Sequence, residues 1–281
     1  MPTTYNLMLN ASHKNPANNH EYVLQFPASQ TFTSQDTIRM ESCNIIYSWA
    51  NLTSAYNNNS FQYSIGASVF TVQFPQSSFM TISDMNGFLQ SAMQANGTYL
   101  QLKSDQSLWF PVQLLVNPSL YSVEFVLIPF PQTLNSTLYT DPANFYSQFP
   151  GLPAATTPAI TISNNFADIV GITRGTYGGG SNQVTVLSNY TPNVSPVQSL
   201  VLRCNLVYNP MTVSQSDVLF TTTPSQVSYG SNIFTQNMGQ TALSCRSGTF
   251  QSIVVGIYDQ SGSPVVLKDF NCTFLISITR H

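Results

Sequence analysis

Charged side chains are scarce in this sequence of 281 residues. Lys, Arg, Asp and Glu make up 7% of the chain, against about 25% in an average globular domain. The eight Lys and Arg residues are scattered, with no two adjacent. Nucleic acids and anionic membranes are bound by clustered cations. The sequence therefore predicts no nucleic-acid patch, and no apolar run reaches the roughly 20 residues that a membrane span needs.

Cysteine and histidine are equally rare. The cysteines lie too far apart for a disulfide framework or a zinc knuckle, and we interpret them as small buried hydrophobic residues. They are Cys43, Cys204, Cys245 and Cys272. His13 and His20 lie in a polar N-terminal segment, and His281 is the last residue. We therefore expect neither a metal site nor a cofactor.

Groups that could carry catalysis are few. The sequence contains no Gly-x-Ser-x-Gly elbow, no His-Glu-x-x-His motif and no phosphate-binding loop that ends in Gly-Lys-Ser/Thr. Asp36 and Glu41 are the closest carboxylate pair on a predicted strand, but a separation of five residues places them on opposite faces. A pair formed by Glu124 and a distant Asp stays open as the basis of a hydrolase. We expect a protein that is not an enzyme.

Neutral polar residues are abundant. Asn, Ser, Thr and Gln together account for 109 residues, hydrophobic residues for 42% and aromatic residues for 12%. This hydrophobic content suffices for a core, and the net charge of −3 is far from the high net charge of a disordered chain. Neutral polar surfaces can pack against copies of themselves without the cost of desolvating charges. They can also bind sugars where aromatic rings are exposed.

Alternation with a period of two dominates the chain and predicts β-strands that bury one face. About ten strands, separated by turn residues, favour an all-β antiparallel sandwich. The predicted strands are residues 22–26, 37–49, 61–65, 70–74, 98–102, 111–116, 121–127, 184–187, 200–208, 253–257 and 274–278.

One segment has helical spacing instead. The apolar residues recur every three or four positions between Ile82 and Met93, and Thr81 or Ser83 can cap the start. Gly97 lies just past the end, where glycine commonly terminates a helix. The pattern predicts a helix over residues 82–95 that covers one end of the sandwich. A weaker helical turn is predicted at residues 165–170.

The order of several segments resembles that of a known protein family. The segments are the helix at residues 81–93, Asn-Phe-Ala-Asp-Ile-Val-Gly-Ile at 165–172, Ser-Leu-Val-Leu-Arg-Cys-Asn-Leu-Val at 199–207, and Val-Gly-Ile-Tyr-Asp-Gln-Ser-Gly-Ser-Pro-Val at 255–265. Together they are similar to the penton and minor capsid proteins of the double-jelly-roll virus lineage, in particular those of virophages and polinton-like elements.

The resemblance implies a single jelly roll that assembles as a homopentamer and closes the five-fold vertices of an icosahedral capsid. Its partners would be copies of itself and the double-jelly-roll major capsid protein. It would reside in the virion, after assembly in the cytoplasm of the host cell. Another minor capsid protein of the same lineage and a glycan-binding attachment module are the alternatives.

Because no shift in composition divides the chain, we expect one domain over residues 1–281. Residues 1–19 would form an N-terminal arm, and residues 129–160 a long Pro-rich surface loop. Long loops without secondary structure are usually functional or disordered, and the aromatic residues of this one favour a contact arm. Our candidate assembly contacts are Tyr139, Phe145, Tyr146 and Phe149.

Overall fold

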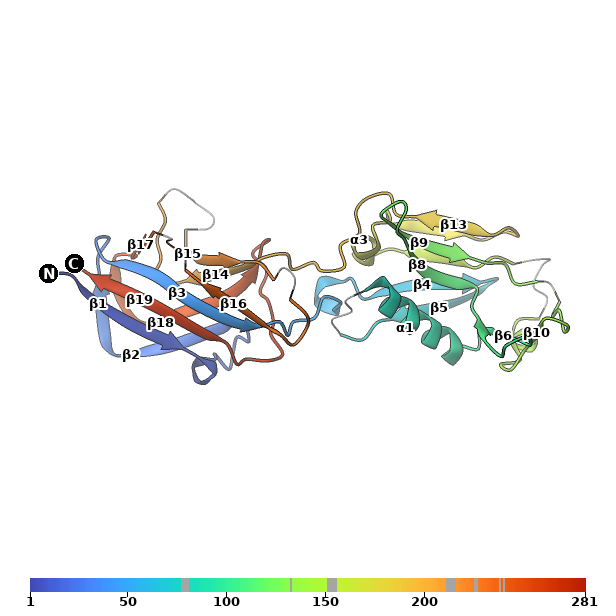
Figure 1. The fold of residues 1–281 in the computed structure, drawn as a ribbon, viewed down its shortest axis with the longest axis horizontal. Helices are drawn as coiled ribbons and strands as arrows, with labels where there is room; N and C mark the ends of the chain where they lie inside the picture. The colour runs from blue at the N-terminus through green and yellow to red at the C-terminus, as the bar shows by residue number, and fades with distance from the viewer. Residues whose placement is uncertain are drawn as a thin grey trace. The chain divides into compact units, whose positions relative to one another are not determined.

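The computed structural model describes residues 1–76, 81–131, 133–150, 156–210, 216–224, 227–237, 239 and 241–281. The chain forms two compact units, each with its own hydrophobic core (Figure 1). Unit 1 combines Met1–Ala50 with Val197–His281, and unit 2 is the continuous segment Asn51–Pro196. The composition of the sequence predicts one domain. The division is not visible in the sequence because the chain crosses between the units at Ala50 and Val197 without a linker of distinct composition.

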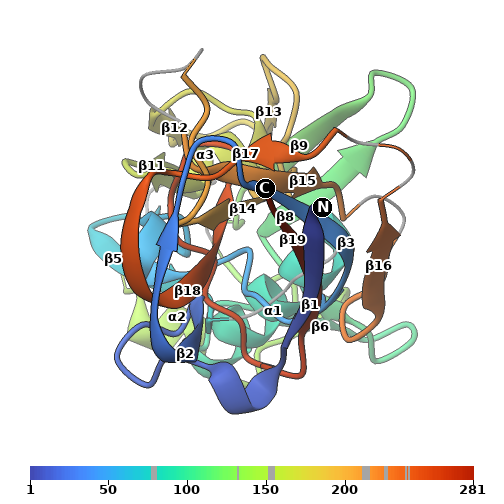
Figure 2. The ribbon, with the colours of Figure 1, turned by 90° about the vertical axis from the view of Figure 1, so that its left-hand side faces the viewer.

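Unit 1 is a sandwich of two antiparallel sheets. The first sheet has the order β1-β19-β3-β16, with a short β17 that also pairs with β3, and the second has the order β15-β14-β18-β2 (Figure 2). The strands of the first sheet are β1 (Thr3–Leu9), β19 (Thr273–Arg280), β3 (Thr37–Ile46), β16 (Asn232–Gln236) and β17 (Leu243–Ser244). Those of the second are β15 (Val218–Thr222), β14 (Leu200–Cys204), β18 (Gly248–Asp259) and β2 (Glu21–Phe32).

The strand order of unit 1 is that of a jelly roll. Without the two-residue β17, the first sheet consists of the first, eighth, third and sixth strands of the unit. The second sheet consists of the fifth, fourth, seventh and second strands. Eight strands in two such sheets make two Greek keys, the arrangement of a jelly roll. The expected all-β jelly-roll fold is therefore present, and its eight strands come from unit 1 alone.

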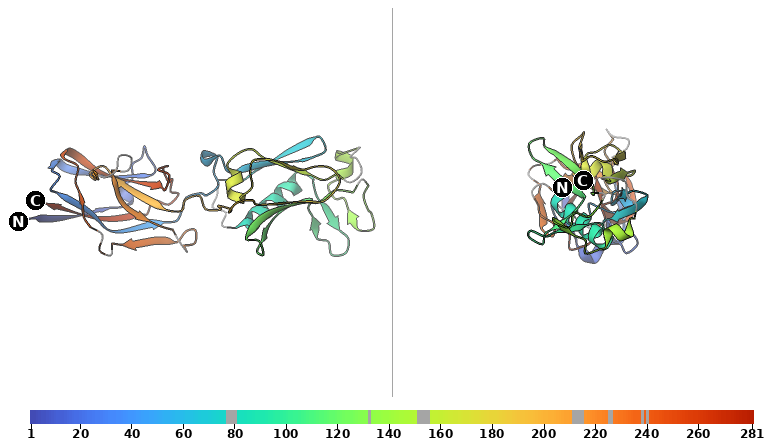
Figure 3. Two further views of the ribbon diagram at one scale, coloured as in Figure 1. Left: turned by 90° about the horizontal axis from the view of Figure 1, so that it is seen from above. Right: turned by 90° about the vertical axis from the view of Figure 1, so that its right-hand side faces the viewer.

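The two ends of the chain form neighbouring strands of unit 1. β1 pairs with β19 from Thr3 opposite Arg280 to Leu9 opposite Phe274, and both termini lie at one end of the unit (Figure 3). The expected N-terminal arm thus begins with a strand of seven residues, followed by the 3-10 helix η1 (Ala11–His13). The apolar positions of β1 explain this, because Leu9 is buried in the core of unit 1.

Unit 2 contains two larger sheets and one small sheet. The larger sheets have the orders β12-β11-β4-β5 and β13-β9-β8, and the small one β10-β6-β7. Their strands are β4 (Ser60–Ile65), β5 (Ser68–Gln73), β6 (Leu100–Leu102), β7 (Leu108–Trp109), β8 (Val112–Asn117), β9 (Ser122–Leu127), β10 (Tyr139–Thr140), β11 (Ala159–Ile162), β12 (Gly175–Gly178) and β13 (Val184–Leu187). The helices are η2 (Ser54–Tyr56), α1 (Ile82–Ala95), α2 (Phe145–Gln148) and α3 (Phe166–Val170).

The helix expected from periodicity is confirmed at both ends. The Thr81 hydroxyl accepts a hydrogen bond from the Asp84 amide, and the Asp84 carboxylate accepts one from the Thr81 amide, which completes a capping box. The apolar stripe is buried, and the Leu114 amide of β8 donates to Asn86 Oδ1 at 2.9 Å. The helix therefore packs against β8. The weaker helical turn is α3.

Aromatic rings dominate the core of unit 2. The ring of Phe166 stacks on Phe61 and Phe74 at centroid distances of 5.2 and 5.3 Å, and Phe125 meets Phe61 edge-on at 5.4 Å. These residues come from β4, β9 and α3 and from the position directly after β5. The rings therefore pack the two larger sheets and α3 against one another.

The predicted long loop contains more structure than its composition indicated. Between Pro129 and Pro158, the chain forms β10 and α2, and the Asp141 carboxylate accepts hydrogen bonds from the Phe145 and Tyr146 amides at 2.7 and 3.1 Å. Residue 132 and residues 151–155, which the prediction also covered, lie outside the described part of the chain.

Candidate assembly surface

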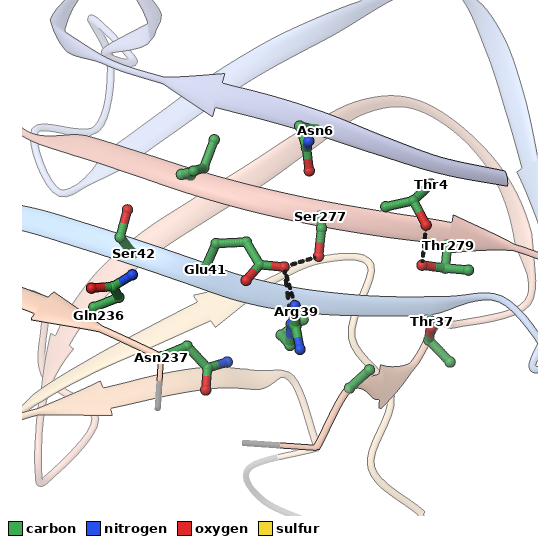
Figure 4. A pocket seen from close by; sticks show the side chains of 12 residues that line it. Thr4, Asn6, Thr37, Arg39, Glu41, Ser42, Gln236, Asn237, Ser277 and Thr279 are labelled. Carbon is green, nitrogen blue, oxygen red and sulfur yellow. Dashed lines mark hydrogen bonds and ion pairs between the residues drawn. The ribbon is translucent and has the colours of Figure 1, made fainter. Parts of the chain in front are cut away.

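One whole sheet face of unit 1 points away from the core. In β19, Phe274, Ile276 and Ile278 are buried in the sandwich, so Leu275, Ser277 and Thr279 lie on the opposite side. We call this side the outer face. It forms a shallow hollow of about 640 Å³ (Figure 4). Its polar lining is Thr4, Asn6, Thr37, Arg39, Glu41, Ser42, Gln236, Asn237, Ser277 and Thr279.

The outer face combines side chains from strands that are far apart in the sequence. β1 and β19 contribute alternate residues, whereas β3 contributes four residues and β16 contributes Gln236. The cross-strand partners Thr4 and Thr279 are linked by a hydroxyl–hydroxyl hydrogen bond of 3.0 Å. Two further cross-strand Thr pairs bond at 3.0 Å on other sheets, Thr31 with Thr249 and Thr161 with Thr176. Hydroxyl groups paired across strands are therefore a repeated feature of both units.

The two charged residues that line the hollow neutralise each other. Arg39 Nη2 lies 2.7 Å from Glu41 Oε1, and the Ser277 hydroxyl donates to the same carboxylate oxygen (Figure 4). Partial burial alone would raise the pKa of Glu41, but the hydrogen bonds from Ser277 and Arg39 and the charge of Arg39 outweigh burial and lower it. The lining of the hollow therefore carries no net charge.

The aromatic residues that the sequence analysis proposed as contacts lie inside unit 2. Phe145 is fully buried and stacks on Phe130 with 3.9 Å between ring centroids. Phe149 and Tyr146 are partly buried and pack against Phe145, and the Tyr146 hydroxyl donates to the Pro131 carbonyl at 2.9 Å. Tyr139, in β10, contacts Trp109. This corrects the interpretation of Phe145, whose ring is enclosed by its own unit.

The residues considered for catalysis do not converge. Glu124 accepts a hydrogen bond from Asn117 at 3.1 Å, and the buried Asp36 accepts one from the His281 amide at 3.0 Å. His13 is hydrogen-bonded to Asn10, whereas His20 lies 3.7 Å from Glu21. Among the described residues, no group of three or more His, Cys, Asp and Glu side chains lies close enough together to hold a metal ion.

The cysteines are buried and free, as their interpretation as small hydrophobic residues requires. Burial raises the pKa of Cys43 to about 11 and the pKa values of Cys204 and Cys245 to about 12. They therefore stay as thiols at neutral pH. None of the helices in the described part of the chain is long and apolar enough to cross a bilayer.

Sequence reasoning missed the outer face. The signal was nevertheless present, because Thr4 and Asn6 alternate with apolar neighbours, as do Ser277 and Thr279. Such alternation locates a polar face on each strand. It does not reveal that strands from opposite ends of the chain bring these faces together.

No family model and no curated protein matches the sequence. Among solved structures, the chain is similar to the crystal structure of mavirus penton protein, with 11% identity, a TM-score of 0.48 and coverage of 100% of this chain and 99% of that chain. It is also similar to a chain of the Sputnik virophage structure, with 11% identity, a TM-score of 0.40 and coverage of 99% and 97%. At this identity the likeness concerns the fold.

Proposed function

We propose that the chain is a structural subunit of a virus capsid and acts through contacts between copies of its jelly roll. The observation that carries this proposal is the outer face of unit 1, a whole sheet surface whose two charged lining residues neutralise each other. Interface cores between proteins are depleted in charge, and burying an unpaired charge is costly. A surface of hydroxyl and amide groups can be covered by a neighbouring subunit without that cost.

The jelly-roll order of unit 1 supports the same function. Eight-stranded jelly rolls occur in viral capsid proteins, lectins and cupins. The lining of the outer-face hollow contains no aromatic ring on which a sugar could stack. At this hollow, the surface therefore favours a contact between proteins over the binding of a sugar.

More specifically, we propose that the chain is a penton protein. In this function, five copies form a ring that closes a five-fold vertex, and the rim of the ring contacts the major capsid protein inside the virion. Assembly of the particle would take place in the host cell, in the cytoplasm. A ring requires two different, complementary surfaces on each subunit, and the opposite edges of the jelly roll are available for this purpose.

Light scattering of the purified chain tests the proposal. We expect a single species of five times the chain mass of 30.9 kDa. A stable trimer would favour another position in the shell. A monomer at all concentrations, together with saturable binding on a glycan array, would contradict the proposal and favour the attachment module.

A further inference from the structure

A second hollow lies at the edge of the jelly roll where the two sheets separate. It has a volume of about 360 Å³ and is lined mainly by Tyr5 and Leu7 of β1 and by Phe26, Pro27 and Phe32 of β2, with Arg280 beside them. We call it the edge hollow. Roughly 150 Å³ is enough to hold a benzene ring in a protein cavity, so the edge hollow can accept an aromatic side chain.

The edge hollow exposes residues that belong to the core side of the sheet. Tyr5 pairs with Ile278 and Leu7 with Ile276, and both isoleucines face the core. Leu9, on the same side of β1, is completely buried, whereas Tyr5 is 54% exposed. The core side of β1 is therefore covered at one end of the strand and open at the other.

A bulge in β2 keeps this end open. Along β18, Ser252 pairs with Gln25 and Phe250 with Gln30, so that residues 26–29 of β2 lie outside the regular register. Pro27 is within the bulge and has no amide hydrogen to donate. Bulges and prolines commonly terminate pairing at sheet edges. The opening is thus built into the backbone of β2.

The charged group at the edge hollow is already satisfied within its own subunit. Arg280 donates to the Thr31 carbonyl and to Gln30 Oε1, and its Nε lies 3.9 Å from Asp36. Its guanidinium carbon also lies 5.0 Å from the centre of the Phe32 ring. A group that enters the edge hollow therefore needs no charge of its own.

The opposite edge of the same sheet carries an exposed aromatic side chain. β16 is at the far end of the order β1-β19-β3-β16, and its Phe234 is 65% exposed. The neighbouring Ile233 is buried, and Thr235 bonds to Thr222 of the second sheet, so Phe234 points away from the core. The strand Asn232–Gln236 contains no charged residue.

We propose that Phe234 of one copy inserts into the edge hollow of the next copy. The inference rests on the proposed capsid function and identifies one of its contacts. A second copy of the chain suits the edge hollow because its Phe234 is uncharged. The charge of Arg280 at the edge hollow is already paired with Asp36 in its own subunit. A copy that donates Phe234 keeps its own edge hollow free, since the two features lie at opposite edges. The contact is therefore heterologous and can continue from copy to copy.

Cross-linking of a double variant tests the contact. In Tyr5→Cys/Asn232→Cys, the Phe234 ring is kept, and Asn232 is exposed on the same side of β16. A short bismaleimide should join neighbouring copies of this variant into a ladder on a denaturing gel, because every contact brings the two new thiols close together. The native cysteines are buried and do not compete. The matched control Tyr5→Cys/Tyr208→Cys, in which Tyr208 is 46% exposed on unit 1, should give no ladder.

The single variants and a non-covalent readout complete the test. Phe234→Ala should keep the circular dichroism spectrum and weaken self-association about tenfold or more, because the buried ring is lost. Linked dimers from Asn232→Cys alone would overturn the proposal in favour of a two-fold contact. If the double variant kept the oligomeric mass of the wild type and yet gave no ladder, the contact would lie elsewhere. This result would not contradict the capsid function. A monomeric wild-type chain would overturn both.

Discussion

The two units use their few charged residues in different ways. Unit 1 contains six basic and six acidic residues, whereas unit 2 contains two basic and five acidic ones. In unit 1, acidic residues pair with arginines, as in Arg39–Glu41, Arg203–Asp217 and Arg280–Asp36. Asp36 and Asp259 of unit 1 also accept hydrogen bonds from backbone amides. In unit 2, Asp84 and Asp141 accept such bonds at helix starts, without an arginine partner in the described part of the chain.

This difference indicates which unit is suited to close packing between copies. Three ion pairs take up six of the twelve Lys, Arg, Asp and Glu residues of unit 1, and these paired charges can be covered by a neighbour at little electrostatic cost. The net charge of −3 on unit 2 makes copies of this unit repel one another weakly and favours exposure to solvent. This difference supports the proposal that the assembly contacts lie on the jelly roll.

The largest change to the molecule is the removal of unit 2. We expect unit 1 to stay folded without it. If residues 51–196 are replaced by a short Gly/Ser linker, unit 1 should fold, because Trp49 and Val197 on either side of the insertion belong to one core. Residues 51–196 alone should also fold around their aromatic core. Each product should unfold cooperatively in calorimetry. Loss of cooperative unfolding in either product would mean that the units depend on each other.

Two matched core substitutions should separate the units in the full chain. Phe166→Ala removes a buried ring from unit 2, and Phe274→Ala removes one from unit 1. Each should cost about 3–5 kcal/mol of unfolding free energy. We expect each variant to lower only the calorimetric transition of its own unit. A shift of both transitions by one substitution would contradict independent cores.

Asp36→Asn should destabilise unit 1 by about 2 kcal/mol, because the carboxylate accepts several hydrogen bonds in a buried position. Burial opposes its ionisation, yet bonds from Thr33 and His281 and the charge of Arg280 lower the pKa of Asp36. Its stabilising effect is therefore complete above the unfolded-state pKa and lost as the pH falls through the lower folded-state value.

Denaturant unfolding of Asp36→Asn and wild type between pH 7 and pH 2 should show the two stabilities converge at low pH. Glu124→Gln in unit 2 is the matched control, and it should change stability by less than about 0.5 kcal/mol. If the difference in unfolding free energy between wild type and Asp36→Asn stayed constant across the pH range, the charge of Asp36 would not contribute to stability.

The smallest predicted effect compares two glycines of unit 2. Gly87 lies in α1, and a Cβ atom there would meet nothing within 4 Å, so Gly87→Ala should stabilise the unit by about 0.5–1 kcal/mol. Gly171 has a φ of +70°, and a Cβ would lie 2.3 Å from the Tyr190 carbonyl oxygen. Gly171→Ala should therefore destabilise the same unit in thermal unfolding. Equal changes in stability for the two variants would show that the backbone conformation of the glycine does not determine the effect of the substitution.

Local patterns predicted the local structure well. The helix at Ile82–Ala95 follows from its apolar spacing and from the capping residues Thr81 and Asp84. The inward positions of β19 follow from the alternation of Phe274, Ile276 and Ile278. Both features depend on residues that are close in sequence, which is why the sequence alone reveals them.

Features that depend on distant residues could not be predicted in the same way. The division between the units is hidden because Ala50 and Asn51 are joined without any change of composition. The outer face requires the pairing of β1 with β19, from opposite ends of the chain. The aromatic residues near Phe145 indicated a contact, but the sequence does not say whether that contact is internal or with another copy.

Electron cryo-microscopy of the purified full chain tests the central claim most directly. We expect closed rings with five-fold symmetry in which neighbouring jelly rolls touch through the edges formed by β1 and β16. Isolated chains, or oligomers held together only through unit 2, would contradict it.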